Sequence, residues 1–359
     1  MSTAAADVTG HASLLALEST DIDVPNRQPP PGWTQVVYRL DNAPFRYAST
    51  RVDVGDGVGL EHAKFHGATR LLATLDDRAV HLLFPYGRDL RLRGVPVERR
   101  LVVLTPPRAS FEGITQVEGC GHTIVLRGSA YEALCARVDV AARLAQWCRA
   151  QTVFAETPAA EDLRAEIEGY YALIARRPDL ALSAPARACA RVSLIDLMGA
   201  ALESLGADDS LTQPPAKAGS RSLALAAERW IWDRVADADA PPVSLGASAA
   251  ALGYSERRLQ QAIEEHFGIS FVRFVRAARL HQARTALRAH GRHGSVSAIA
   301  TRYGFWHLGR FSRYYRETFG EAPSQTAAVR GAGEHASATA QGVALLRTDR
   351  STALIRSRA

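Results

Sequence analysis

The strongest constraint in this sequence is a segment that occurs twice between Val243 and Ser324. The copies are VSLGASAAALGYSERRLQQAIEEHFGIS and SVSAIATRYGFWHLGRFSRYYRETFGEAPS. Placing Gly268 over Gly320 makes apolar residues coincide at helical spacing: Leu259 with Phe311, Ile263 with Tyr315, and Phe267 with Phe319. Gly253 then falls over Gly304 with a one-residue slip in the turn. Each copy therefore predicts a helix-turn-helix, a motif that lays its second helix in the DNA major groove.

Charge is distributed unevenly along the 359 residues. Residues 221–330 hold 16 Arg against 9 Asp and Glu, a balance of +7, whereas residues 1–220 hold 23 basic and 26 acidic residues. The positive charge thus belongs to the duplicated segment, as expected if that segment meets phosphates. Lysine occurs only at 64 and 217, so a genomic composition bias explains the abundance of arginine equally well.

No apolar run approaches the roughly 18–20 residues that a membrane span needs, and the N-terminus lacks the pattern of a secretory signal. We therefore expect a cytoplasmic protein with no membrane contact.

The rest of the chain predicts an α+β protein of two domains. Residues 1–30 are expected to be disordered or weakly docked, residues 31–205 to form the first domain, residues 206–220 a linker, residues 221–330 an all-α domain and residues 331–359 a disordered tail. VVYRL, AVHLLFP, LVVLTPP and HTIVLR are the clearest strands, DLRLRGVPVERR predicts a hairpin with its turn near Gly94, and together they favour a small barrel or sandwich to about residue 128. After Ser129 the strands are expected to stop, and three amphipathic segments predict three helices.

In the first copy of the motif, Ser255 is placed to cap the second helix by accepting the N–H of Arg258. Arg257, Gln260 and Gln261 then point away from the buried face, and these side-chain types suit base edges. Ser255 and Arg258 are expected to contact phosphates.

In the second copy, His307 and Arg313 are the candidate base readers, with Arg313 the main one, and Arg310 and Ser312 are candidate phosphate contacts. Gly309 stands where the first copy has Arg257, so one contact position carries no side chain. Trp306 could stack on the sugar-phosphate backbone, although an aromatic residue just after a turn more often packs into the core. We therefore expect it to be packed.

Between the copies, Ser270 is a plausible cap for a helix that ends near His290. Eighteen residues, 271–288, would span about 27 Å, against about 34 Å for one turn of B-DNA. A rigid helix of that length can hold two reading heads on one face of a duplex. The alternative is an ordinary helical bundle whose repeated apolar faces form only core.

These residues carry a family resemblance. The stretch from about Leu223 to Val329 resembles the DNA-binding domain of AraC/XylS-type bacterial transcription regulators, through GYSERRLQQAIEEHFG, RFVRAARLHQARTAL and the second copy of the motif. The resemblance implies that Arg257, Gln260, Gln261 and Arg313 read bases, while Leu308 and Gly309 depart from the polar residues often found there. Residues 31–205 resemble cupin-like effector domains, notably those of regulators related to ethanolamine-utilisation activators, which implies a β-barrel pocket for a small molecule followed by dimerisation helices.

The leading interpretation is a ligand-responsive transcription activator that binds double-stranded DNA as a homodimer, responds to a small-molecule effector and contacts RNA polymerase. Leu83, Tyr86 and Phe111 are weak candidates for the effector pocket. We expect neither a cofactor, nor a metal, nor enzymatic activity.

Two alternatives remain open. A cupin-like enzyme fused to a DNA-binding domain would need metal ligands; Glu61, His62 and His66 cluster, but no His-x-His pair with a downstream glutamate follows. A sensor based on Cys120 or Cys135 would respond to oxidation or alkylation. The four cysteines show no CxxC or zinc-type spacing, which favours plain packing.

Overall fold

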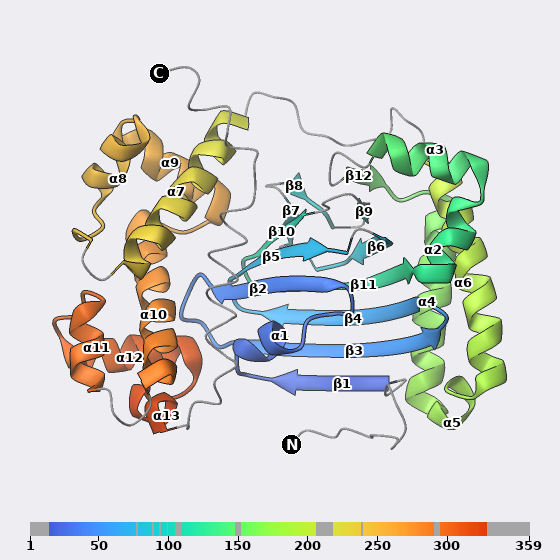
Figure 1. The fold of residues 1–359 in the computed structure, drawn as a ribbon, viewed down its shortest axis with the longest axis horizontal. Helices are drawn as coiled ribbons and strands as arrows, with labels where there is room; N and C mark the ends of the chain where they lie inside the picture. Colours follow the sequence, from blue (N-terminus) through green and yellow to red (C-terminus); the bar gives the residue numbers. More distant parts are fainter. Residues whose placement is uncertain are drawn as a thin grey trace.

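The structure is a computed structural model that describes residues 14–76, 78–87, 90–92, 95–98, 100–104, 110–147, 152–205, 218–237, 240–290 and 295–328. Two antiparallel sheets occupy the middle of the molecule (Figure 1). Helices α2–α6 lie on one side of the sheets and helices α7–α13 on the opposite side. The α+β class and the helical C-terminal region are confirmed. Among the described residues, no helix is long and apolar enough to cross a membrane.

The larger sheet has seven strands, all paired antiparallel. In order across the sheet they are β1 (Leu14–Ser19), β3 (Arg46–Gly55), β4 (Val58–His66), β11 (Glu118–Arg127), β6 (Ala79–Pro85), β9 (Arg100–Leu104) and β12 (Thr152–Ala155). The tight β3–β4 turn needs Gly57, because its φ is +88° and a Cβ there would lie 2.0 Å from the Arg127 carbonyl oxygen. The predicted segments AVHLLFP and HTIVLR are β6 and part of β11.

The smaller sheet has five strands: β2 (Trp33–Arg39), β5 (Thr69–Leu75), β10 (Ser110–Thr115), β7 (Arg91–Leu92) and β8 (Val95–Pro96), in that order. The pairing of β7 with β8 is the predicted hairpin, whose turn at Gly94 lies outside the described residues. Side chains alternate between the faces of a strand. The face that includes Trp33, Leu71 and Phe111 turns toward the larger sheet, and the opposite face turns toward helices α7, α9 and α10.

The region after β11 differs from the prediction in two ways. The first expected helix is split into α2 (Gly128–Cys135) and α3 (Val138–Trp147), and strand β12 follows, where no strand was expected. β12 pairs with β9 at the edge of the larger sheet, so its conformation is set by a partner about 50 residues earlier in the chain. Helices α4 (Pro158–Arg176), α5 (Pro178–Ala181) and α6 (Ala184–Ser204) complete a layer that shares one apolar core with the larger sheet.

The C-terminal region is entirely helical where it is described. Its helices are α7 (Ala218–Ala236), α8 (Leu245–Leu252), α9 (Glu256–Phe267), α10 (Phe271–His290), α11 (Val296–Arg302), α12 (Leu308–Phe319) and α13 (Pro323–Ala328). Most of the expected 206–220 linker and the whole expected 331–359 tail lie outside the described residues.

The N-terminal segment is the main correction to the predicted organisation. Residues 14–30 were expected to be disordered or weakly docked, but β1 pairs with β3 along its whole length and α1 (Asp23–Arg27) follows it. Two of the polar residues that suggested disorder, Asp21 and Asp23, instead form ion pairs with Arg284 of the C-terminal helices. Residues 1–13 lie outside the described part of the chain.

Candidate nucleic-acid interface

The first helix-turn-helix is α8, a tight turn and α9. The Ser244 hydroxyl accepts the Ala247 N–H to start α8, and Gly253 ends it with a φ of +74°. The Ser255 hydroxyl accepts the Arg258 N–H at 3.3 Å, so the predicted cap of α9 is present. Each helix boundary is therefore encoded by a residue whose chemistry fits that backbone position.

The exposed side of α9 carries the residues expected to read bases. Leu259, Ala262, Ile263 and Phe267 are buried, whereas Arg257, Gln260 and Gln261 are exposed and Arg258 is half-buried. The amides of Gln260 and Gln261 donate to Glu264 and Glu265 one turn later, at 3.1 and 2.9 Å. These bonds hold both glutamine side chains along the exposed surface of α9.

The second motif is α11, a turn and α12. The Ser295 hydroxyl caps α11 through the Ala298 N–H, and Gly304, with a φ of +81°, follows Tyr303 in the turn. The buried face of α12 consists of Phe311, Tyr315, Thr318 and Phe319. His307 occupies the N-cap position of α12 without a side-chain capping bond. Arg313 and Arg310 are exposed with His307, and Ser312 is half-buried.

The turn of the second motif is one residue longer than that of the first. At the end of the first helix, the N–H groups of Gly253 and Tyr254 donate to the carbonyls of Ala250 and Ala249. In the second motif, the N–H groups of Gly304 and Phe305 donate to the carbonyls of Thr301 and Ala300. These bonds match those of the first motif at an offset of 51 residues, whereas the recognition helices match at 52. The N-cap residues of the two recognition helices, Ser255 and His307, lie 52 residues apart. The additional residue in the second turn is therefore Trp306.

Trp306 is 77% exposed, which contradicts the expectation that it packs into the core. Trp306 is an inserted turn residue, so no buried position of the first motif corresponds to it. The adjacent apolar position is filled by Phe305, which packs against Phe311 with ring centroids 5.0 Å apart. The one-residue slip between the two copies was the sequence signal that could have identified this residue.

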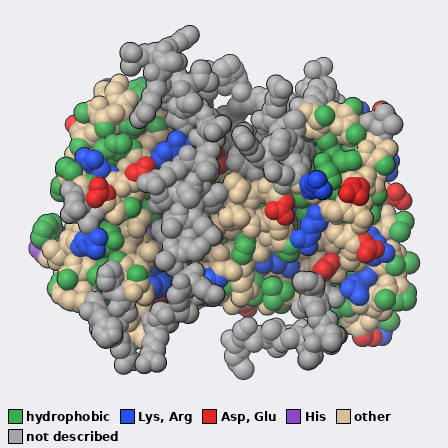
Figure 2. All heavy atoms as spheres, in the orientation of Figure 1, with side chains coloured by type: hydrophobic (Ala, Val, Ile, Leu, Met, Phe, Trp, Pro, Cys, Tyr) green, Lys and Arg blue, Asp and Glu red, His purple; other side chains and the backbone are tan. Residues whose placement is uncertain are grey.

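Helix α10 joins the two motifs into one unit. Phe271, Phe274, Val275 and Ala278 in its first half share a core with the first motif. Leu280, Ala283 and Leu287 in its second half share a core with the second. Its 20 residues give a length of about 30 Å, close to the ~34 Å of one duplex turn. Figure 2 shows Arg side chains interleaved with apolar and acidic ones over the side of the molecule that contains α7–α13.

The first half of this helical domain is anchored to the smaller sheet by a buried charge network. Arg70 of β5 donates to both oxygens of Glu228 on α7, at 3.1 and 3.0 Å, and the Tyr38 hydroxyl donates to the same carboxylate. Nearby, Arg221 donates to Glu112 at 2.7 Å. Burial lowers the pKa of Arg70, but Glu228 and Glu112 outweigh it and raise the pKa of that guanidinium overall.

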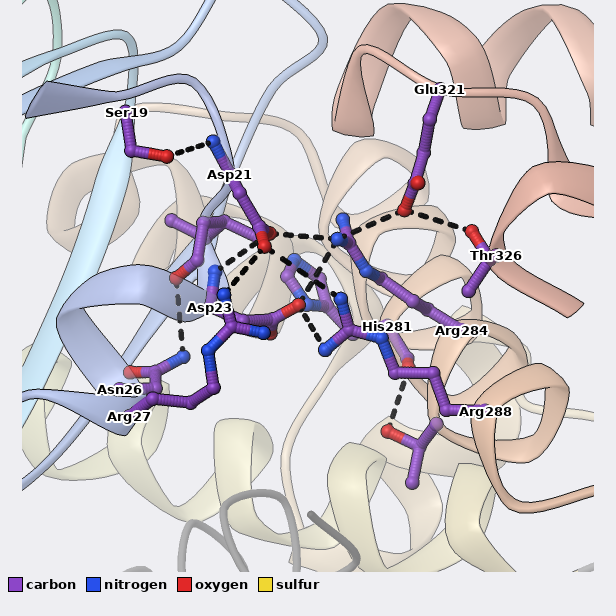
Figure 3. A network of polar contacts seen from close by, with 12 residues as sticks. Ser19, Asp21, Asp23, Asn26, Arg27, His281, Arg284, Arg288, Glu321 and Thr326 are labelled. Carbon is purple, nitrogen blue, oxygen red and sulfur yellow. Dashed lines mark hydrogen bonds and ion pairs between the residues drawn. The ribbon is translucent and has the colours of Figure 1, made fainter. Parts of the chain in front are cut away.

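The second half is anchored by a cluster of carboxylates around two arginines of α10 (Figure 3). Arg284 pairs with Asp21, Asp23 and Glu321 at 2.8, 3.0 and 3.0 Å. Arg288 also contacts Asp23. Burial raises the pKa of Asp23 against the pull of both arginines, whereas for Asp21 the arginines outweigh burial and lower the pKa.

A cavity of about 90 Å³ lies between the two sheets. Two of the candidate effector residues, Leu83 and Phe111, line it, together with Trp33, Tyr47, Phe65 and Leu71. Tyr86 does not line it: its ring stacks on His62 at 5.9 Å and its side chain is partly exposed. Tyr86 comes just after β6 ends, beyond the strand alternation on which that expectation rested. The volume is several times the ~10–15 Å³ that one water needs.

In the described part of the chain, the residues proposed for a metal-dependent enzyme and for a cysteine sensor do not form a recognisable reactive site. Glu61 lines the cavity, but its carboxylate already accepts hydrogen bonds from Arg51 and Ser49, both at 2.8 Å. His62, the next residue of β4, points to the opposite face of the sheet and packs near Tyr171. Among the described ranges, no group of three His, Cys, Asp or Glu side chains could hold a metal ion. Burial raises the pKa of Cys120 to about 11, the opposite of what a reactive thiolate needs.

Comparison with known proteins concerns mainly the C-terminal region. A family model described as a helix-turn-helix domain matches residues 248–328. Over 85 residues the chain is 38% identical to the XylDLEGF operon transcriptional activator 2 of Pseudomonas putida, covering 23% of this chain and 54% of that protein. It is 36% identical over 85 residues to the probable thc operon regulatory protein of Rhodococcus erythropolis, covering 23% of this chain and 26% of that protein. The chain thus spans about a quarter to about half of the length of these relatives.

Two solved structures are also similar. The AraC-like transcriptional activator CuxR aligns with 75% of this chain and 94% of its own, at 15% identity and a TM-score of 0.38. The C-terminal domain of AraT from Geobacillus stearothermophilus aligns with 32% of this chain and 89% of its own, at 24% identity and a TM-score of 0.27. With the family match and the paired motifs, the conclusion is that this chain carries a C-terminal helix-turn-helix domain of the AraC/XylS type.

Proposed function

We propose that the protein is a ligand-responsive transcriptional regulator, in the first instance an activator, that reads two adjacent major-groove segments of double-stranded DNA. The observation that carries the proposal is the pair of exposed recognition helices, α9 and α12, whose buried faces are fixed to opposite halves of α10. A bundle that served only as core would not need two such helices with arginine and glutamine on their free faces.

The residues have distinct proposed roles. Arg257, Gln260 and Gln261 on α9 and His307 and Arg313 on α12 read base edges, because all five are exposed and carry donors or acceptors suited to them. The phosphate contacts are assigned to residues near the two helix starts, where backbone N–H groups also favour anions: Ser255, Arg258, Arg310 and Ser312.

The test begins with duplexes selected by the full chain from a random-sequence library. Gln261→Ala should relax the preference at one base pair and leave binding to random DNA nearly unchanged, whereas Arg258→Ala should weaken binding to every duplex and reduce the salt dependence. Affinities for the selected and the scrambled duplex measure both effects. Equal losses on both duplexes for both variants would contradict these roles.

The effector part of the proposal rests on the smaller sheet. One face of β2, β5 and β10 lines the cavity through Trp33, Leu71 and Phe111. The opposite face contacts the helical domain through Tyr38, Arg70 and other residues. A molecule that shifts these strands would therefore move the groups that anchor the first motif, since a packed sheet transmits displacement rather than absorbing it.

Trp33 provides a direct measurement of effector binding. Its indole donates to His81 at 3.1 Å and its ring lies 5.5 Å from Phe111 at the cavity wall. A panel of small aromatic and aliphatic compounds should include some that raise the melting temperature and change the tryptophan fluorescence of the wild-type chain but not that of Trp33→Phe, which keeps the other four tryptophans. Leu71→Trp, which would fill the cavity, should abolish both responses, and Leu173→Trp on α4 should not. Homodimer formation through α2–α6 and contact with RNA polymerase belong to the same proposal.

A further inference from the structure

Two apolar side chains stand exposed at the start of the second recognition helix. Trp306 is 77% exposed and Leu308, the first residue of α12, is 44% exposed. Trp306 has the highest exposed fraction among the large hydrophobic residues of the described ranges. Single exposed apolar residues need no explanation, but these two flank the N-cap of a helix whose start faces base edges in this kind of motif.

The corresponding positions of the first motif are different. Leu308 takes the place of Glu256, and Gly309 takes the place of Arg257, when the two caps are superposed. Trp306 has no counterpart at all. A Cβ added to Gly309 would meet nothing within 4 Å, so the space beside Leu308 is open. The second motif therefore presents an apolar tip, Trp306 and Leu308, where the first presents charge.

Charge around the tip indicates the kind of surface that it meets. His307, Arg310 and Arg313 are exposed beside it, and Arg302 is exposed on α11. An apolar protein surface would desolvate these cations and supply no anion beyond Glu317, which lies 3.7 Å from Arg313. A duplex instead offers phosphates for the cations and methyl groups for the tip. The only apolar group on a base edge in the major groove is the C5-methyl of thymine.

We infer that Trp306 and Leu308 recognise thymine methyl groups in the segment bound by α12, so that the second motif reads DNA by apolar contact where the first reads by hydrogen bonds. The inference rests on the proposed function and adds a specificity determinant to it. Gly309 permits close approach because it places no side chain between Leu308 and the groove floor.

The experiment replaces each thymine of a selected duplex, one at a time, by deoxyuridine, which removes only the methyl group. The segment bound by α12 is identified as the positions at which Arg313→Ala relaxes preference. Within it, one or two replacements should weaken binding of the full chain about three- to fivefold, the value for burying one methyl-sized group. Leu308→Ala should bind the unmodified duplex more weakly and lose this sensitivity, and Trp306→Ala should reduce it.

Val272→Ala is the matched control, because Val272 is 71% exposed in the same domain but lies outside both recognition helices. It should retain full sensitivity to deoxyuridine. If no replacement in the α12 segment weakens binding, or if Leu308→Ala and Trp306→Ala keep the wild-type sensitivity, the inference is wrong while the proposed function stands. If the full chain enriches no duplex from the library, the proposed function itself is wrong.

Discussion

The two helix-turn-helix motifs share the same order of helix, turn and helix. They differ in the residues that they expose to solvent and in the contacts that attach them to the rest of the protein. The first presents Arg257, Gln260 and Gln261 to solvent, and its half of the domain is anchored through Glu228, which is fully buried with Arg70. The second presents Trp306 and Leu308 ahead of its arginines, and its half is anchored through carboxylates that keep contact with water, with side chains 19–31% exposed.

Because the two attachments to the N-terminal domain differ in burial, they should respond differently to ionic strength. Screening by salt is strong for exposed charges and weak for buried pairs. The attachment of the second motif, around Arg284, should therefore loosen first as ionic strength rises, while the Arg70–Glu228 pair persists. Removing one member of the buried pair should be far more damaging, because the remaining charge cannot recover its hydration.

The largest expected effect comes from Glu228→Ala. The change leaves the buried Arg70 guanidinium and the Tyr38 hydroxyl without the carboxylate that binds both, so the free energy of unfolding should fall by about 3–5 kcal/mol. Urea unfolding measures it. The matched comparison at the second anchor is Asp21→Ala, since Arg284 keeps Asp23 and Glu321 and the loss should be about 1 kcal/mol. Equal losses in the two variants would remove the distinction between the two anchors.

The next effect is a pH dependence centred on His281 of α10. Burial lowers the pKa of His281 to about 3, and its Nε2 accepts the Arg39 N–H at 3.0 Å. Because the folded pKa lies below the unfolded value of about 6.5, this contribution to stability is complete above pH 6.5 and is lost as the pH falls toward 3.

Between pH 6 and pH 4, His281 alone should reduce the free energy of unfolding by roughly 1.4 kcal/mol per pH unit. His281→Gln, whose amide oxygen can accept the same N–H, should flatten the profile by that amount. Urea unfolding at half-unit intervals of pH gives both slopes. The buried His81 and His266, whose pKa burial also lowers to about 3, act as internal references because they remain in both proteins. Identical slopes would show that His281 is not the titrating group.

The smallest effect concerns the reading faces themselves. Gly309→Gln adds an amide at a position with open space, and should create a new preference for adenine at one base pair of about 1 kcal/mol. Arg257→Gly makes the reciprocal change in the first motif and should erase a preference of similar size. Competition binding with base-substituted duplexes measures both. If Gly309→Gln leaves every preference unchanged, α12 does not enter the groove in the way that α9 does.

Local chemistry made parts of the candidate site predictable. The cap at Ser255, the glycine turns, and the buried faces of α9 and α12 depend on neighbours within four residues, so residue type and spacing were enough. β6 could be recognised from its own residues, since all of them are buried and the run is apolar apart from His81. The burial of Trp306 was predicted wrongly, because a general tendency of aromatic residues was preferred to the slip between the copies.

Features that depend on distant partners were not predictable. β12 forms because β9 offers it an edge, and residues 14–27 are held by β3 and by Arg284 far along the chain. Strands as short as β12, with four residues, and β1, with six, carry too few residues for a periodic signal that reveals such partners. Tyr86 failed as a cavity residue because strand alternation stops where β6 ends.

Spacing and capping within single turns were enough to predict that two amphipathic helix pairs repeat, that α9 starts after Ser255, and which side chains each recognition helix leaves free. The packing of distant segments alone sets the smaller sheet between a cavity and the helical domain. It also decided that Arg70, Glu228 and Arg284 are anchors rather than surface charges, since burial and ion pairing depend on segments brought together across roughly 150 to 260 residues of chain.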